Sequence, residues 1–181
     1  MSAIGMNEFM SIPAGMFACD AMLKAADVEL VSAGCVCAGK YYIVVTGDVA
    51  AVRSAVEAGK ADSESYLVDS LVIPNVDSQV APAICACTSV EQLNALGIME
   101  CYSLCAAIHA ADAAAKAADV TLLEVRLGRG LGGKSFVLLT GEVAAVEASI
   151  RAAEALEETK GLMARSCVIP SPHPDMLKAI G

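Results

Sequence analysis

Residues 24–28 read Lys24-Ala25-Ala26-Asp27-Val28, and the same five residues return at an offset of 92 as Lys116-Ala117-Ala118-Asp119-Val120. The same offset pairs identical residues outside this segment: Gly5 with Gly97, Glu8 with Glu100, Ser11 with Ser103 and Asp20 with Asp112. Identities spread over so long a stretch indicate a tandem duplication. The chain has 181 residues, so each copy is about 90 residues long, enough for a small domain with its own core.

The offset between the copies changes twice along the chain. At an offset of 94, Lys40 pairs with Lys134 and Gly47 with Gly141; at 96, residues 72–74 pair with residues 168–170. Each change marks a two-residue insertion in the second copy. The first insertion falls between Val31 and Lys40, so the two copies differ in the loop before this lysine. We predict a first domain over residues 1–90 and a second over residues 91–181.

Each copy has the pattern of strands and helices in the order β-α-β-β-α-β. In the first copy an apolar stretch over residues 3–10 precedes an Ala-rich segment with apolar residues at helical spacing through residue 26. Strand-like runs follow over residues 28–36 and 41–45, then a helix from Asp48 to about residue 58 and a last strand over residues 66–73. The predicted fold class is α+β, with each domain a two-layer α/β sandwich of the split βαβ type.

Composition excludes several classes of protein. The residues are 56% apolar, but the longest apolar run falls short of the roughly 18 residues that cross a membrane. The excess of apolar residues predicts flat subunit contacts. A net charge of −9 without a basic tract argues against nucleic acid as a partner. The first residues lack the pattern of a secretory signal, so we expect a cytoplasmic protein whose eight cysteines are not disulfide-bonded.

Several segments resemble one known family, the bacterial microcompartment shell proteins, in its unpermuted tandem-domain form. The matching residues are Ala3-Ile4-Gly5 with Glu8, residues 15–28, residues 47–52 and Val168-Ile169-Pro170-Ser171-Pro172-His173. The resemblance covers nearly the whole chain and is strongest to the propanediol-utilisation branch. It implies a homotrimer whose six domains form a pseudohexamer that tiles edge to edge with other shell proteins, around enzymes inside a compartment. The implied role is architectural, not enzymatic.

The resemblance also implies roles for particular residues. Lys24 and Lys116 match the lysine at the tiling edge, although each also fits a solvated helix lysine. The loops before Lys40 and Lys134 match the loops that line a central pore. The predicted pore-loop residues are Gly34, Cys35, Cys37, Ala38 and Gly39 in the first copy and Gly128, Arg129, Gly130, Leu131 and Gly132 in the second.

Cys37 matches the position at which members of this branch carry an iron–sulfur cluster. Three-fold symmetry brings three Cys37 thiolates to one axis, which could hold one [4Fe–4S] cluster per trimer with one iron left for a non-protein ligand. The alternative for Cys37 is an idle thiol. Cys35 follows the same strand period and is either a second group near the site or a packing residue. The other six cysteines lie in apolar surroundings and are expected to be small core residues: Cys19, Cys85, Cys87, Cys101, Cys105 and Cys167.

Residues 128–135 satisfy the phosphate-binding pattern G-x-x-x-x-G-K-S, but the pattern needs a helix to begin at the lysine. The repeat instead predicts a strand from Ser135, so we expect no nucleotide site. Neither His109 nor His173 has a partner placed by the sequence for nucleophilic catalysis. Three functions remain: a shell subunit with a cluster in its pore, a shell subunit whose metal-free pore passes small metabolites, or a ferredoxin-like small-molecule sensor.

Overall fold

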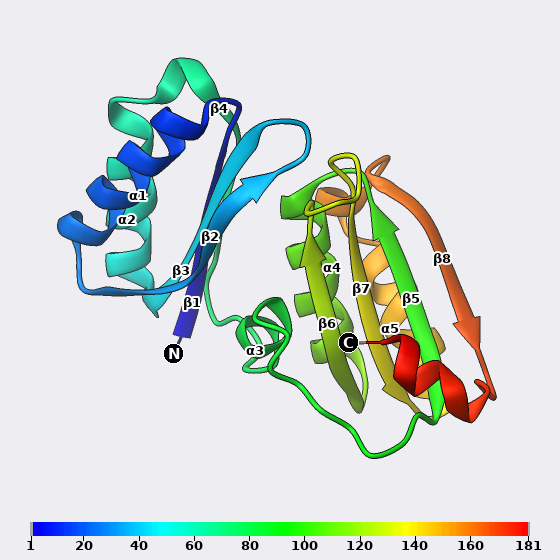
Figure 1. The fold of residues 1–181 in the computed structure, drawn as a ribbon. Helices are drawn as coiled ribbons and strands as arrows, with labels where there is room; N and C mark the ends of the chain where they lie inside the picture. Colours follow the sequence, from blue (N-terminus) through cyan, green and yellow to red (C-terminus); the bar gives the residue numbers. More distant parts are fainter. Residues whose placement is uncertain (1, 181) are drawn as a thin grey trace. The chain divides into compact units, whose positions relative to one another are not determined.

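A computed structural model describes residues 2–180, except for the side chain of Ala179 (Figure 1). The first repeat contains β1 (Ser2–Phe9), α1 (Ile12–Ala25), β2 (Val28–Val36), β3 (Lys40–Asp48), α2 (Val49–Ala61), a 3₁₀ turn η1 (Glu64–Tyr66) and β4 (Leu67–Ile73). A short helix, α3 (Val80–Ile84), follows. The second repeat contains β5 (Ala95–Cys101), α4 (Leu104–Ala117), β6 (Val120–Leu127), β7 (Ser135–Gly141), α5 (Val143–Glu154), η2 (Glu157–Thr159), β8 (Met163–Ile169) and η3 (Pro174–Ala179).

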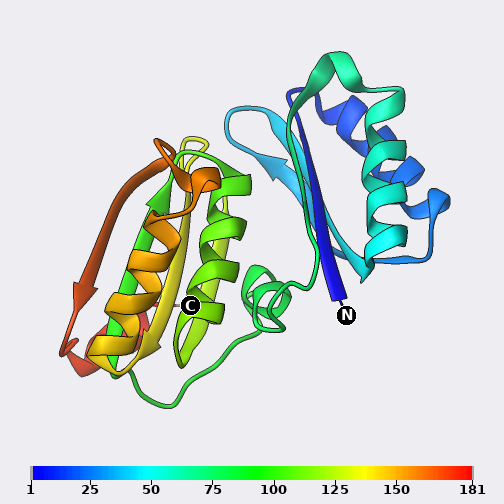
Figure 2. The ribbon, with the colours of Figure 1, turned by 180° about the vertical axis from the view of Figure 1, so that it is seen from behind.

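Each repeat forms one four-stranded antiparallel sheet. The strand orders are β2-β3-β1-β4 and β6-β7-β5-β8, so the third strand of each repeat lies between the first two. In both repeats the two long helices lie against one face of the sheet, as Figures 1 and 2 show from opposite sides. This arrangement confirms the predicted α+β class and the split βαβ order. The chain divides into two compact units, residues 1–81 with 129–133, and residues 82–128 with 134–181.

Several residues that are identical in the two repeats have the same structural role in each. Ser11 and Ser103 are the N-cap residues of α1 and α4, where each hydroxyl accepts a hydrogen bond from the backbone N–H three residues later, at 3.4 and 3.3 Å. Helix α2 continues to Ala61, beyond the predicted end near residue 58. Gly59 therefore lies within the helix, where it packs closely against α1. A Cβ atom on Gly59 would lie 2.6 Å from Met22 Cγ.

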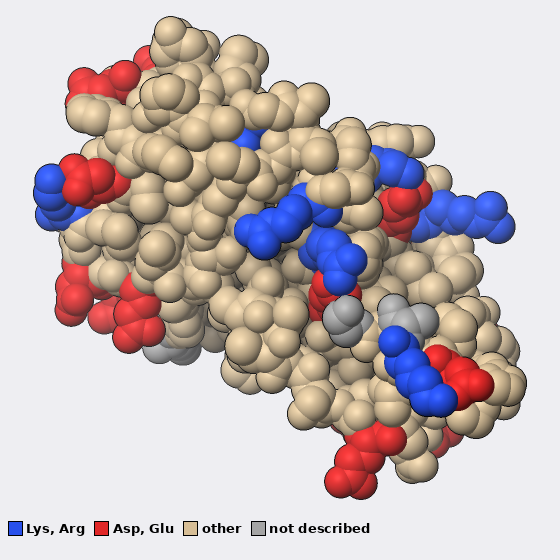
Figure 3. Space-filling view, in the orientation of Figure 1, with Lys and Arg blue, Asp and Glu red and all other residues tan. Residues whose placement is uncertain are grey.

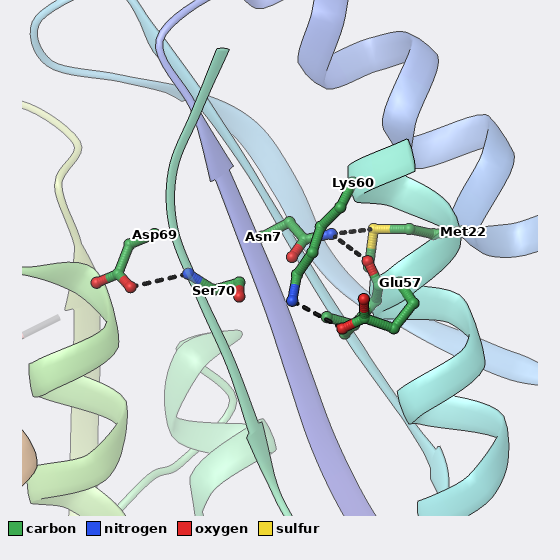
Figure 4. Close-up of polar contacts among 7 residues, drawn as sticks. Asn7, Met22, Glu57, Lys60, Asp69 and Ser70 are labelled. Carbon is green, nitrogen blue, oxygen red and sulfur yellow. Dashed lines mark hydrogen bonds and ion pairs between the residues drawn. The ribbon is translucent and has the colours of Figure 1, made fainter. Parts of the chain in front are cut away.

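The core of the first unit lies between β1, β3 and the two helices, and it includes Phe9, Met22, Ile43 and Val56. Asn7 of β1 is also fully buried there (Figure 4). Its Nδ2 donates a hydrogen bond to the Val56 carbonyl at 2.9 Å and contacts Met22 Sδ at 3.6 Å. These contacts hold the first strand against both helices.

The paired glycines of the first strands allow the second helix of each repeat to approach the sheet closely. A Cβ atom on Gly5 would lie 2.6 Å from Val52 Cγ1, and one on Gly97 would lie 2.8 Å from Val146 Cγ1. We expect Gly5→Ala and Gly97→Ala each to lower the free energy of unfolding by about 1–3 kcal/mol, because the branched valines cannot move aside without strain. Urea unfolding at a fixed protein concentration measures this. An unchanged midpoint in either variant would contradict the close packing.

Candidate functional site

Cys37 lies in the three-residue turn, residues 37–39, that joins β2 to β3. Its side chain is half-buried, whereas Ala38 and Gly39 are exposed. Gly39 has a φ of 77°, in the left-handed region that glycine adopts without strain. The turn therefore holds one partly accessible thiol at the end of a hairpin.

The corresponding connection in the second repeat is longer and rich in glycine. It spans residues 128–134, between β6 and β7, and Gly130, Gly132 and Gly133 have φ values of 74°, 64° and 89°. Residues 129–133 cluster with the first unit and lie beside the Cys37 turn. A Cβ atom on Gly133 would lie 3.4 Å from the Cys37 carbonyl oxygen.

The glycine loop also affects the acidity of the Cys37 thiol. Hydrogen bonds from Gly130 and Gly132, with a smaller contribution from Leu131, lower the pKa of the Cys37 thiol below its ordinary value and outweigh the opposing effect of burial. Backbone donors of this kind favour a thiolate, the form of cysteine that binds metals. The approach of the glycine loop to Cys37 could not be predicted from the sequence, because backbone conformation leaves no trace in residue identity.

The Arg129 side chain also lies close to Gly34 in this region. A Cβ atom on Gly34 would lie 3.2 Å from Arg129 Nη2, so the guanidinium lies against the β2 backbone near the turn. The arginine side chain is otherwise exposed. The predicted pore-loop residues Gly34, Cys37, Arg129, Gly130, Leu131 and Gly132 thus occupy one end of the first unit.

Cys35 is exposed and lies on β2 opposite Tyr41 of β3. The strand ends at Val36, so the two-residue alternation that places Cys35 and Cys37 on one face stops before Cys37. No contact between the two sulfurs follows from the strand pattern. The role of Cys35 as a second group near the site stays a prediction.

The expectation of six core cysteines is wrong for three of them. Cys101 and Cys105 are buried, and Cys19 is half-buried against the first core. Cys85, Cys87 and Cys167 are exposed in the described chain. Cys167 lines a hollow of about 330 Å³ with Ile98, Phe136 and Leu138, on the face of β8 that points away from the helices. The apolar residues next to these cysteines in the sequence therefore did not predict whether the thiols are buried or exposed.

We expect the free energy of unfolding to depend on pH through the thiol of Cys101. Burial, with Glu100 as a smaller cause, raises the pKa of its thiol from 9.0 to about 11. The folded chain therefore keeps this proton after the unfolded chain has lost it, so Cys101 contributes stability below pH 9 that disappears as the pH rises from about 9 to about 11. Relative to a Cys101→Ala variant, the wild type should lose more of its free energy of unfolding between about pH 8 and about pH 10.5. Urea titrations with a reductant at both pH values measure the difference; equal losses would contradict the assignment.

The two predicted edge lysines are each paired within their own helix. Lys24 Nζ lies 2.6 Å from Asp20 Oδ2, and Lys116 Nζ lies 2.6 Å from Asp112 Oδ2. Lys24 is the more exposed, with 74% of its side chain accessible against 40% for Lys116. The repeated aspartates thus orient both lysines, and their part in tiling stays a prediction.

Lys134 of the phosphate-binding pattern donates to Glu100 Oε1 at 2.6 Å, and Ser135 begins β7. The lysine is therefore engaged by a carboxylate, and the predicted strand from Ser135 is confirmed, so the helix that the phosphate-binding pattern needs does not begin there. His173 is the N-cap residue of η3, where its Nδ1 accepts from the Asp175 N–H at 3.2 Å.

Residues 2–180 show neither a group of metal ligands nor a membrane-spanning helix. No three or more His, Cys, Asp or Glu side chains in this part of the chain are grouped to hold a metal ion. No helix within it has the length and apolar character needed to cross a membrane. On the face in Figure 3, basic and acidic side chains are interspersed on a mostly uncharged surface.

Comparisons with known proteins agree with the geometry. The family model described as "BMC domain" matches residues 3–76 and 95–172. The chain is 43% identical to the bacterial microcompartment shell protein PduT of Citrobacter freundii, covering 96% of this chain and 95% of that protein. The shell protein PduA of Salmonella typhimurium is 40% identical over 49% of this chain and 93% of its own length. A crystal structure of a microcompartment protein from Desulfitobacterium hafniense matches with a TM-score of 0.94 and 50% identity, covering 99% of both chains.

Proposed function

Because the chain belongs to the BMC-domain family and carries the domain twice, we propose that it forms a homotrimer in which three Cys37 thiolates hold one [4Fe–4S] cluster on the three-fold axis. It is a structural subunit of a bacterial microcompartment shell. The cluster occupies the central pore and serves electron transfer across the shell or delivery of the cluster to enzymes inside. The protein itself is not an enzyme.

The observation that carries the proposal is the position of Cys37 in the turn between β2 and β3, with the glycine loop over residues 128–134 beside it. A cluster ligand must be a thiolate, and hydrogen bonds from Gly130, Gly132 and Leu131 favour that form. The thiol is also only half-buried, so a cluster has access to it. The residues present therefore fit an iron–sulfur ligand.

The number of thiols supports a shared site. The loop over residues 128–134 contains no cysteine, so each chain offers one thiol from its pore loops besides the strand residue Cys35. A ring of six identical domains would bring six such cysteines together, whereas three tandem chains bring three. Three thiolates suit a four-iron cluster with one iron open to a non-protein ligand.

When bound, the cluster supplies one-electron transfer. The residues of this chain hold and surround it. Cys37 supplies the ligand atom, and the glycines of the second loop allow the backbone to approach the axis closely. Arg129 adds a positive charge beside a site that carries net negative charge from its thiolates and sulfides.

Lys24 and Lys116 belong to the proposed tiling edge. Their ammonium groups lie at the last turns of α1 and α4, each held by an aspartate one turn earlier. A neighbouring trimer or another shell protein would accept hydrogen bonds from these groups through its backbone carbonyls. The proposed partners are thus further copies of this chain, other shell proteins and the enzymes that the shell encloses.

The proposal is tested on wild-type protein purified without oxygen. We expect a brown protein with about four irons per trimer and an EPR signal after reduction. Colourless protein that takes up no iron on reconstitution would overturn the cluster and leave a metal-free pore for metabolites. A chain that stays monomeric and forms no sheets would overturn the trimer and favour a sensor.

A further inference from the structure

Cys85 and Cys87 are two exposed thiols, separated by one residue, that follow the C-terminal end of α3. They are not disulfide-bonded in the structure. The sequence contains one other pair of cysteines with this spacing, Cys35 and Cys37. The two pairs differ in the conformation of the residue between the cysteines, so the chain provides its own comparison.

The backbone turns sharply at Ala86, the residue between the first two thiols. Its φ is 54°, in the left-handed region. The Ala86 N–H donates to the Ala83 carbonyl at 3.3 Å, and the Cys87 N–H donates to the Pro82 carbonyl at 3.0 Å. These two bonds form a common helix C-terminal motif, in which the residue after the cap is left-handed. Cys85 and Cys87 therefore lie on either side of a hydrogen-bonded turn.

This turn sets the separation of the two cysteine Cα atoms. A residue with helical dihedral angles of either hand places the Cα atoms of its neighbours about 5.4 Å apart, from the radius and rise of the helix. Disulfides most often join Cα atoms about 5.5–6 Å apart. Val36 lies in β2, and an extended residue separates its neighbours by about 6.6 Å, near the upper limit for a disulfide. The backbone therefore favours a disulfide between Cys85 and Cys87 over one between Cys35 and Cys37.

The side chains are also free to approach each other. The Cys87 thiol points back toward its partner residue, where it donates to the Cys85 carbonyl oxygen at 3.5 Å. Both side chains are exposed, so packing does not oppose rotation about χ1, which takes nanoseconds or less at such sites. Exposure also gives small reagents in solution access to either sulfur.

We propose that Cys85 and Cys87 form a redox-active dithiol, which exchanges with low-molecular-weight disulfides and closes into an intramolecular disulfide. One thiolate attacks a sulfur of the small disulfide and releases one small thiol. The other thiolate then attacks the protein sulfur of this mixed disulfide and releases the second small thiol. One S–S bond breaks and one forms. Two electrons pass from the cysteines to the small disulfide, whose sulfurs take up the two protons that the cysteines lose.

The proposed disulfide is of the labile kind. It closes a small ring at an exposed site, and strained or exposed disulfides are the ones that thiols reduce again most readily. The proposal is independent of the iron–sulfur cluster and of the trimer, because it needs only residues 82–87 of one chain.

Thiol trapping and peptide mapping test the proposal on the full chain. The protein, as purified and after treatment with a chelator that leaves Cys37 unprotected, is equilibrated without oxygen in mixtures of reduced and oxidised glutathione. It is then alkylated and cleaved after glutamate. Residues 65–91 form a peptide whose only cysteines are the proposed pair, and residues 30–57 form one whose only cysteines are Cys35 and Cys37.

We expect the peptide of residues 65–91 to lose the mass of two hydrogen atoms and to resist alkylation, at glutathione ratios where residues 30–57 contain no internal disulfide. An excess of reduced glutathione should reverse the change. The proposal is overturned if both thiols stay reduced at every ratio, or if they carry glutathione instead of the internal bond. Equal formation of an internal disulfide in both peptides would also overturn it, because the turn would then give no advantage.

Substitution of Ala86 tests the role of the backbone. Ala86→Val should raise about tenfold the ratio of oxidised to squared reduced glutathione at which half of the pair is oxidised, because a β-branched residue resists the left-handed conformation. Ala86→Gly is the matched control and should oxidise at least as readily as the wild type, since glycine adopts this conformation without strain. An Ala86→Val protein with the wild-type ratio would contradict the proposed geometry.

Discussion

A Cys37→Ala variant is expected to form the same trimer as the wild type but to lose its iron, from about four atoms per trimer to nearly none. The side chain is half-buried in a turn that lies outside both sheets and all long helices, so its removal should leave these elements intact. The loss should be complete, because three-fold symmetry removes all three protein ligands with one substitution. Iron analysis, visible absorption and EPR of reduced protein measure it, with size-exclusion chromatography to verify the trimer.

Cys35→Ala is the matched control. It removes an exposed thiol two residues away on the same hairpin, without touching the turn. Cys167→Ala tests another exposed thiol in the second unit. Both variants should keep the wild-type iron content. A Cys37→Ala protein that retains its cluster, or a Cys35→Ala protein that loses it, would remove Cys37 from its proposed role.

The duplication made most of the fold predictable, because a residue that is repeated has the same structural role in both repeats. Ser11 and Ser103 begin the first helices, and Gly5 and Gly97 admit the second helices to the sheet. Elements without a repeated signature were missed. Helix α3 and the three 3₁₀ turns are too short for a hydrophobic period to reveal them.

The candidate site was predictable only in part. Unequal loop lengths and the resemblance indicated Cys37, but the approach of the glycine loop to the Cys37 turn depends on backbone conformation and long-range folding. Exposure of Cys85 and Cys87 was not predicted either. They follow the C-terminal end of α3, where Ala86 adopts a φ of 54° and turns the chain, so the apolar residues around them in sequence do not surround them in space.

The second large effect is expected on stability, from the ion pairs of the glutamates in β1 and β5. Glu8 is ion-paired with Lys40, and the equivalent Glu100 with Lys134. The Glu8 side chain is only 2% exposed, whereas that of Glu100 is 40% exposed. We expect Lys40→Met to lower the free energy of unfolding by about 3–5 kcal/mol, because it leaves a buried carboxylate without its counter-charge. Urea unfolding at one protein concentration measures the change.

The duplication supplies the control for this prediction. Lys134→Met breaks the equivalent pair where water can solvate Glu100, so its cost should be only about 0–1 kcal/mol. A Glu8→Gln/Lys40→Met double variant should recover most of the loss, because no buried charge then remains unpaired. Equal costs for Lys40→Met and Lys134→Met would show that burial does not separate the two pairs. A double variant no more stable than Lys40→Met would attribute the loss to packing of the lysine chain and not to the charge of Glu8.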